Sequence, residues 1–197
     1  MIDLYLASGS PRRRELLAQI HVTFEKISAP VDETPLPDEL AHDYVLRLAR
    51  AKAEAGWLQM QAQGLPVRPV LGADTTVALA DHLLGKPEDD AQAIAMLKML
   101  SGTTHEVLTA VALRTQSGCD TVLSTSRVRF AAMSDAQIAA YVASGEPHDK
   151  AGSYGIQGLG GLFVEHLDGS FTGVMGLPLH ETAMLLAHAG LGFLAVK

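Results

Sequence analysis

The sequence predicts an α/β fold, and three observations lead to that prediction. The chain opens with a short apolar run that passes through a tight polar turn into a helical pattern. Further apolar runs then alternate with helical patterns along the chain. No repeat or flexible linker separates them, so any lobes are expected to pack closely around a cleft.

The first half of the chain contains two predicted strands and two predicted helices. Residues 3–7 form the first strand, and the helix of SPRRRELLAQI follows, with Ser10 as N-cap and Pro11 at its first position. A second strand near residues 22–28 leads into a loop rich in proline and acidic residues. A long helix then runs from about residue 39 to residue 63.

The second half alternates in the same way. The pattern of VRPVLGADTTVALA is typical of one or two strands, and that of GKPEDDAQAIAMLKML is typical of a turn and a helix. The apolar runs on either side of QSGCD are expected to form a hairpin. Ser134 caps a helix that ends at Gly145. A glycine-rich stretch follows, with a hairpin turn expected at Asp168 and Gly169, and LHETAMLLAHAG closes the chain as a helix.

Composition narrows the class of protein. The chain has 197 residues, which suits one domain or two small lobes with a substantial core, and its 48% hydrophobic content argues against disorder. A net charge of −7 disfavours a broad nucleic-acid surface. One cysteine cannot form an internal disulfide, and no run reaches the roughly 18 apolar residues of a membrane span. We therefore expect a cytoplasmic protein with neither nucleic acid nor membrane as partner.

The arginine-rich turn at the start of the first helix predicts an anion site. A helix N-terminus carries about half a positive charge, so cations are unfavourable there unless an anion lies between them. Ser8, Ser10, Arg12 and Arg13 would surround such an anion with hydroxyl, backbone N–H and guanidinium donors, which suits phosphate. The alternative is a solvated basic turn with Glu15 as neighbour.

Lys52 lies on the apolar line of the long helix. An unpaired ammonium there would be costly, so we expect Lys52 to meet a carboxylate or a bound anion. The alternative is that its methylene stem packs in the core while the ammonium reaches water.

Asp74 interrupts the apolar run VLGADTTVALA, where a bare charge is poorly solvated. A carboxylate in such a place usually binds a metal, holds a cation or acts as a base. The alternative is a turn cap bonded to Thr75 or Thr76.

Four further positions give weaker signals. Asp32 and Glu33 of the acidic loop offer a second carboxylate, and Lys86 of GKP could reach a phosphate. Gln157 offers an amide for a base edge, and the alternative is that the glycines around it only permit close packing of the lobes. These glycines follow a helix and lead into an apolar run, so they do not form a Rossmann dinucleotide loop, and no P-loop or zinc motif is present.

Five motifs follow one another over about residues 4–185: LASGSPRRRELL, GADTTV, GKP, DKAGSYGIQGLGG and GLPLHET. Together they resemble the Maf family of nucleoside triphosphate pyrophosphatases. The resemblance implies a mixed twisted sheet with flanking helices, in two lobes around a central cleft, similar to inosine triphosphate pyrophosphatases. It implies a single Maf-like domain over residues 1–197 and a possible homodimer. It also implies hydrolysis of a nucleoside triphosphate to monophosphate and pyrophosphate with Mg²⁺ or Mn²⁺.

The resemblance also implies roles for individual residues. Ser8, Arg12, Arg13, Lys52 and Lys86 match the family's phosphate-binding positions. Asp74 matches the family's proposed proton acceptor. Glu33 and Asp74 match acidic positions near the metal. Arg12, Thr75 and Gln157 together resemble the branch that acts on dTTP and UTP.

These expectations combine into one mechanism. Asp74 would direct water at the α-phosphorus, while Arg12, Arg13, Lys52 and Lys86 neutralise the triphosphate and stabilise the leaving pyrophosphate. The family's link to septum formation leaves a second hypothesis, a regulator that senses nucleotides without cleaving them.

Overall fold

The computed structural model describes residues 2–80 and 82–192, and its elements alternate between strands and helices. The strands are β1 (Leu4–Ala7), β2 (Phe24–Lys26), β3 (Val70–Leu79), β4 (His82–Leu84), β5 (Thr104–Thr115), β6 (Gly118–Phe130) and β7 (Val164–Asp168). The helices are α1 (Pro11–Gln19), α2 (Ala41–Ala62), α3 (Asp90–Leu100), α4 (Asp135–Ala143), α5 (Phe171–Met175) and α6 (Leu179–His188), with short 3-10 helices η1 (Glu146–Asp149), η2 (Ala151–Ser153) and η3 (Leu159–Phe163).

The strands form one mixed sheet in the order β2-β1-β3-β5-β6-β7, with β4 paired to β3. β1 is parallel to both β2 and β3, whereas β4 and β7 are antiparallel to their partners. Only Gln116 and Ser117 join the neighbouring strands β5 and β6, so these form the predicted hairpin. The predicted α/β class with a mixed sheet and flanking helices is confirmed.

The chain divides into two compact units. Unit 1 comprises the residues up to Asp74, Thr109–Ser124 and the residues from Gly176 on. Unit 2 comprises Thr75–Leu108 and Thr125–Met175. The predictions of a single domain and of a cleft between closely packed lobes stay predictions.

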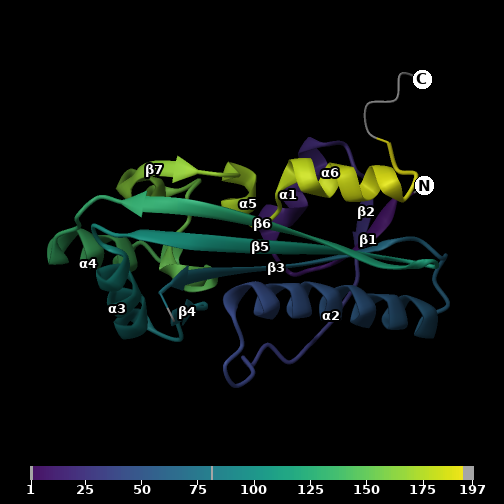
Figure 1. Ribbon diagram of the computed structural model, residues 1–197, viewed down its shortest axis with the longest axis horizontal. Coiled ribbons are helices and arrows are strands. Elements are labelled where there is room, and N and C mark those ends of the chain that lie inside the picture. The colour runs from purple at the N-terminus through teal and green to yellow at the C-terminus, as the bar shows by residue number, and fades with distance from the viewer. Residues whose placement is uncertain (1, 81, 193–197) are drawn as a thin grey trace. The chain divides into compact units, whose positions relative to one another are not determined.

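In unit 1, α2 packs against β1 and β3, and two glycines set how closely. A Cβ on Gly72 would lie 2.5 Å from the carbonyl oxygen of Ala49 and from the amide nitrogen of Ala53. A Cβ on Gly56 would lie 2.8 Å from Val70. Helix and strand backbones are therefore nearly in contact. Figure 1 shows α2 on one side of these strands and α1 and α6 on the other.

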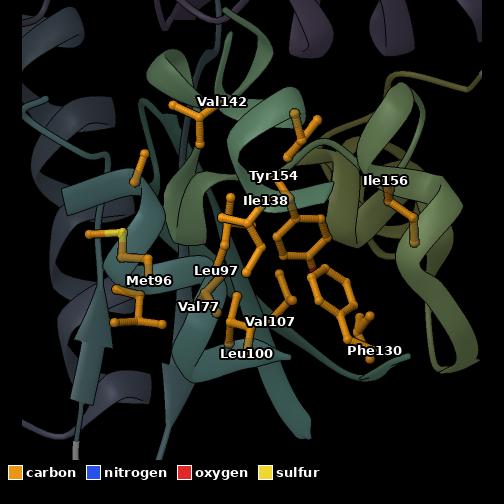
Figure 2. Close-up of a cluster of buried hydrophobic side chains, with 14 residues drawn as sticks. Val77, Met96, Leu97, Leu100, Val107, Phe130, Ile138, Val142, Tyr154 and Ile156 are labelled. Atoms are coloured by element: carbon orange, nitrogen blue, oxygen red, sulfur yellow. The ribbon is translucent and has the colours of Figure 1, made fainter. Parts of the chain in front are cut away.

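Unit 2 has its own hydrophobic core, in which side chains of α3 and α4 meet the strands (Figure 2). Phe130 and Tyr154 lie edge to face there, with ring centroids 4.7 Å apart. The ring of His105 contacts both of them in T-shaped geometry. Edge-to-face packing of this kind fixes ring orientation as well as burying apolar area.

The structure departs from the sequence expectations at three places. The second strand is shorter than expected, and β4 is an additional short strand. The hairpin expected at Asp168 and Gly169 is wrong, because β7 ends at Asp168 and α5 follows it. Gly169 has a φ of +127°, and a Cβ there would lie 2.6 Å from Ser126 Oγ, so close approach to β6 explains this glycine.

Within the described residues, no helix is long and apolar enough to cross a membrane.

Candidate active site

Lys52 is held on the packing face of α2. The buried residues Leu48, Ala49, Ala53 and Gly56 surround its position on the helix, and only 12% of its side chain is exposed. Gly72 and Gly56 bring α2 close to the sheet, and the Lys52 side chain reaches strand β3 there. The prediction that Lys52 points inward is confirmed.

Asp74 meets Lys52 from strand β3, which is buried along almost its whole length. Lys52 Nζ donates to Asp74 Oδ1 over 2.7 Å. The same ammonium lies 2.7 Å from Oε1 of Glu33, whose side chain is half exposed. One cation therefore joins two carboxylates that are distant in the sequence, and Asp74 lies within strand β3 and not in a turn.

The environment of Asp74 favours proton uptake more than that of an ordinary aspartate. Burial raises the pKa of Asp74, and the charge of Glu33 acts in the same direction. The charges of Lys52 and Arg13 and the hydrogen bond from Lys52 oppose that rise without cancelling it. A carboxylate with a raised pKa beside fixed cations is the environment expected of a general base.

Arg13 is buried in unit 1 with only 8% of its surface exposed. Its Nε donates to the carbonyl oxygen of Gly176 over 2.8 Å, and one terminal nitrogen donates to Ser8 Oγ over 3.1 Å. Burial lowers the pKa of the Arg13 guanidinium, and Asp74 and Glu33 are close enough for their charges to oppose this shift. Arg13, Lys52, Asp74 and Glu33 thus share one electrostatic environment in unit 1.

The loop before α1 differs from its prediction in one detail. Ser10 occupies the N-cap position with extended backbone, but its side chain makes no capping hydrogen bond. Instead, Ser8 Oγ accepts from the Ser10 amide over 3.2 Å as well as from Arg13. Arg12 is half-buried, and its charge contributes to lowering the pKa of Arg13.

Two residues that the sequence analysis did not single out hold the acidic loop. Tyr44 Oη donates to the Glu33 carbonyl oxygen over 2.9 Å, and Arg47 pairs with both oxygens of Glu39 at 2.6 and 2.7 Å. Burial, followed by the charges of Asp74 and Glu33, raises the pKa of Tyr44 to about 12. The signal available in the sequence was spacing, since Tyr44 lies two helical turns before Lys52.

Known proteins resemble this chain over nearly its whole length. The family model described as "Maf-like protein" matches residues 3–189. The chain belongs to the Maf family. A Chromobacterium violaceum protein named dTTP/UTP pyrophosphatase is 54% identical over 187 residues, which cover 95% of this chain and 94% of that protein. A Methylobacillus flagellatus protein of the same name is 55% identical over 190 residues, which cover 96% of this chain and 94% of that protein.

Among solved structures, the Staphylococcus aureus Ham1 protein aligns with 64% of this Maf protein and 71% of its own chain, at 15% identity and a TM-score of 0.44.

The other predicted contacts of this Maf protein belong to unit 2. Thr75 follows Asp74 on β3 and is half-buried, whereas Lys86 and Gln157 are exposed. Gln157 lies in the glycine-rich segment between η2 and η3. Their roles in binding substrate stay predictions.

The predicted metal ligands of this Maf protein are two carboxylates. Among the described residues, no group of three or more His, Cys, Asp or Glu side chains could hold a metal ion. Asp74 and Glu33 nevertheless both form ion pairs with the Lys52 ammonium, and their carboxylates are the oxygen donors that Mg²⁺ prefers. Mg²⁺ is commonly bound through one or two carboxylates together with substrate phosphates, so this donor pair fits a metal that arrives with a nucleotide.

Proposed function

We propose that this Maf protein hydrolyses dTTP and UTP, and modified pyrimidine nucleotides, to the monophosphate and pyrophosphate. This reaction would remove unwanted nucleotides from the cellular pool. The names of relatives that are more than half identical to this chain support the substrate class. A location in the cytoplasm and a homodimer remain predictions that accompany this proposal.

One observation carries the proposal: a buried carboxylate of raised pKa lies beside a lysine and a buried arginine. A triphosphate carries several negative charges, and its hydrolysis places further charge on the leaving pyrophosphate. Lys52 and Arg13 are cations whose positions are set by packing, so little reorganisation is needed when the nucleotide binds. Ser8 is within hydrogen-bond distance of Arg13 and adds a hydroxyl for a phosphate oxygen.

The proposed chemical step is attack of water on the α-phosphorus. The oxygen of the water bonds to the α-phosphorus while Asp74 accepts a proton from that water. The bond between the α-phosphorus and the bridging oxygen breaks. The bridging oxygen leaves with pyrophosphate, whose charge Arg13, Lys52 and Lys86 stabilise. Arg12, Ser10, Thr75 and Gln157 are the proposed further contacts to the nucleotide.

A divalent cation, Mg²⁺ or Mn²⁺, is part of this proposal. Asp74 and Glu33 are the residues that would hold it, and when bound it would neutralise charge on the phosphate oxygens. Lys52 keeps these two carboxylates close together through its ion pairs to both.

The decisive experiment is a screen of ordinary and modified nucleoside triphosphates with Mg²⁺ or Mn²⁺, measured as pyrophosphate released. We expect steady release from dTTP and UTP and much slower release from purine nucleotides. Binding of nucleotide with no pyrophosphate release would contradict the proposal and favour the nucleotide-sensing regulator. Release of inorganic phosphate in place of pyrophosphate would show that the attacked phosphorus is not the α-phosphorus.

A further inference from the structure

The glycine-rich segment of unit 2 folds around one carboxylate that the proposed reaction does not use. Glu146, at the start of η1, accepts the backbone N–H of Leu159 over 2.8 Å and that of Gly160 over 3.0 Å. It also accepts the hydroxyl of Tyr141 over 2.8 Å. That hydroxyl in turn accepts the N–H of Gly155 over 3.2 Å. Glu146 and Tyr141 therefore hold both ends of the segment 155–160.

Two glycines of this segment are required by that arrangement. A Cβ on Gly158 would lie 2.4 Å from Glu146 Oε2, and one on Gly160 would lie 2.7 Å from Tyr141 Oη. A side chain at position 158 would displace the Glu146 carboxylate, and one at position 160 would also meet the backbone oxygen of Gly155 at 2.8 Å. These glycines thus allow the backbone to wrap closely around an anion of the protein itself.

The Glu146 carboxylate stays ionised in this setting. Burial disfavours its charge, but the N–H groups of Gly160 and Leu159, the Tyr141 hydroxyl and the charge of Lys150 outweigh that effect and lower the pKa of Glu146. Hydrogen bonds to an ionised acceptor are about twice as strong as neutral ones. The segment is thus fixed by charge-assisted bonds at Leu159 and Gly160.

Gln157 is the exposed residue with a polar side chain inside this fixed segment. Its neighbours on both sides are restrained, and the segment is also closed by a bond from the Gly158 N–H to the Gly155 carbonyl oxygen over 3.1 Å. A side-chain amide offers one acceptor and two donors, which can match the edge of a base. Such matching requires a backbone that does not move when the base arrives.

We propose that Glu146 is a positioning residue for base recognition: its carboxylate fixes the segment 155–160, so that Gln157 is presented to the nucleotide base in one orientation. This inference rests on the proposed function, because it deepens the account of how that substrate class is selected. Glu146 itself touches neither the substrate nor the reacting atoms. Its effect is on binding and on base discrimination.

Glu146→Gln tests this with little change in shape. Oε1 accepts two donors and Oε2 accepts one, so an amide NH₂ in either position faces a hydrogen-bond donor. We expect KM for UTP and dTTP to rise about tenfold, since charge-assisted bonds of this kind are lost, while kcat changes little. The ratio of kcat/KM for UTP to that for CTP should fall, because these bases differ at the edge that an amide reads.

The matched control is Glu165→Gln, which makes the same chemical change at the exposed ion pair with Arg129, also in unit 2. It should leave KM, kcat and the base ratio unchanged. Tyr141→Phe is the second variant if Glu146→Gln does not fold, and it should shift KM and the base ratio in the same direction by a smaller factor. Amide hydrogen exchange over residues 155–160 is measured on each variant and needs no substrate.

The outcomes separate this inference from the proposed function. The inference is supported if Glu146→Gln shows faster amide hydrogen exchange over residues 155–160, a raised KM and a lower ratio of kcat/KM for UTP to that for CTP. Wild-type KM and base ratio in Glu146→Gln overturn it, whether or not exchange changes, and so does a fall in kcat alone. If the wild-type protein releases no pyrophosphate, the proposed function fails, and the dissociation constants of UTP and CTP replace KM. Failure to bind either nucleotide overturns both proposals.

Discussion

Asp74 in unit 1 is buried and Glu146 in unit 2 is half-buried, and the two carboxylates differ in what surrounds them. Asp74 faces the side-chain cations Lys52 and Arg13, and burial raises its pKa despite them. Glu146 accepts two backbone N–H groups and a tyrosine hydroxyl, and these donors lower its pKa. The surroundings therefore favour proton uptake by one carboxylate and the ionised form of the other.

The difference lies in the kind of partner. Backbone amides are fixed by the fold and can only donate, so a carboxylate bound to them shapes the backbone around it. The cations beside Asp74 are side chains of lysine and arginine, which can donate to phosphate oxygens as well as to the carboxylate, so the aspartate stays available to water. Burial alone therefore does not mark a catalytic carboxylate, whereas the nature of its donors distinguishes the two.

The largest expected effect follows removal of the Asp74 charge. Asp74→Asn should lower kcat for dTTP by on the order of 10²-fold or more, because the proposed base is lost. Pyrophosphate release and nucleotide binding are both measured, and binding should persist. Asp135→Asn, which changes an exposed carboxylate paired with Lys98, is the control and should retain full turnover. Nearly full turnover in Asp74→Asn, with nucleotide still bound, would contradict the assignment of Asp74 as the general base. Asp74 and Glu146 would then not differ in catalytic role.

A second change tests whether close packing of α2 on β3 is what brings Lys52 to Asp74. Gly72→Ala places a Cβ against backbone atoms of Ala49 and Ala53, which cannot rotate away. We expect unfolding by urea to show a loss of about 1–3 kcal/mol, the usual range for overpacking. We also expect lower kcat, since the helix carrying Lys52 must shift.

Gly192→Ala is the control for that change, because a Cβ there meets no atom of residues 2–80 and 82–192 within 4 Å. It should change stability by less than about 0.5 kcal/mol and leave kcat unaffected. Loss of stability in Gly72→Ala with unchanged kcat would show that the lysine reaches Asp74 without help from this contact.

The smallest expected effect is a shift in the pH profile. Activity requires ionised Asp74, so kcat/KM should fall as pH drops through a pKa that lies above the ordinary value of 3.8. Lys52→Met removes a cation that lowers this pKa, so the acid limb of the residual activity should move to higher pH. Glu33→Gln removes an anion that raises it, so the limb should move to lower pH. Shifts in the same direction would contradict the electrostatic account.

Local patterns were sufficient to predict much of unit 1. Lys52 on the apolar line of a helix and Asp74 within a buried strand were both conspicuous, because each places a charge where the periodic pattern calls for an apolar residue. The structure brings these two side chains together at 2.7 Å. Glu33 was less conspicuous, since carboxylates in acidic loops are usually solvated, and the family resemblance identified it.

Contacts between distant segments could not be predicted in this way. Glu146 and Tyr141 are unremarkable in the sequence, and their role depends on how the segment at residues 155–160 turns back on them. The glycines of that segment gave a signal, but several explanations fitted it equally well. Gly169 misled for the same reason: Asp-Gly is a frequent hairpin turn, whereas here the glycine avoids Ser126 on a neighbouring strand.

Helix α2 holds both Lys52 and the loop that carries Glu33, because Tyr44 bonds the Glu33 carbonyl oxygen and Arg47 pairs with Glu39. The stretch between those two attachments, residues 35–38, is exposed. Within it the Leu36 N–H donates to Glu39 Oε2 over 3.0 Å, and the Glu39 N–H donates to the Leu36 carbonyl oxygen over 3.1 Å, so this stretch is joined to the same ion pair. A fluorophore attached to an exposed side chain of this stretch would therefore report on movement of the Glu33 loop when nucleotide binds.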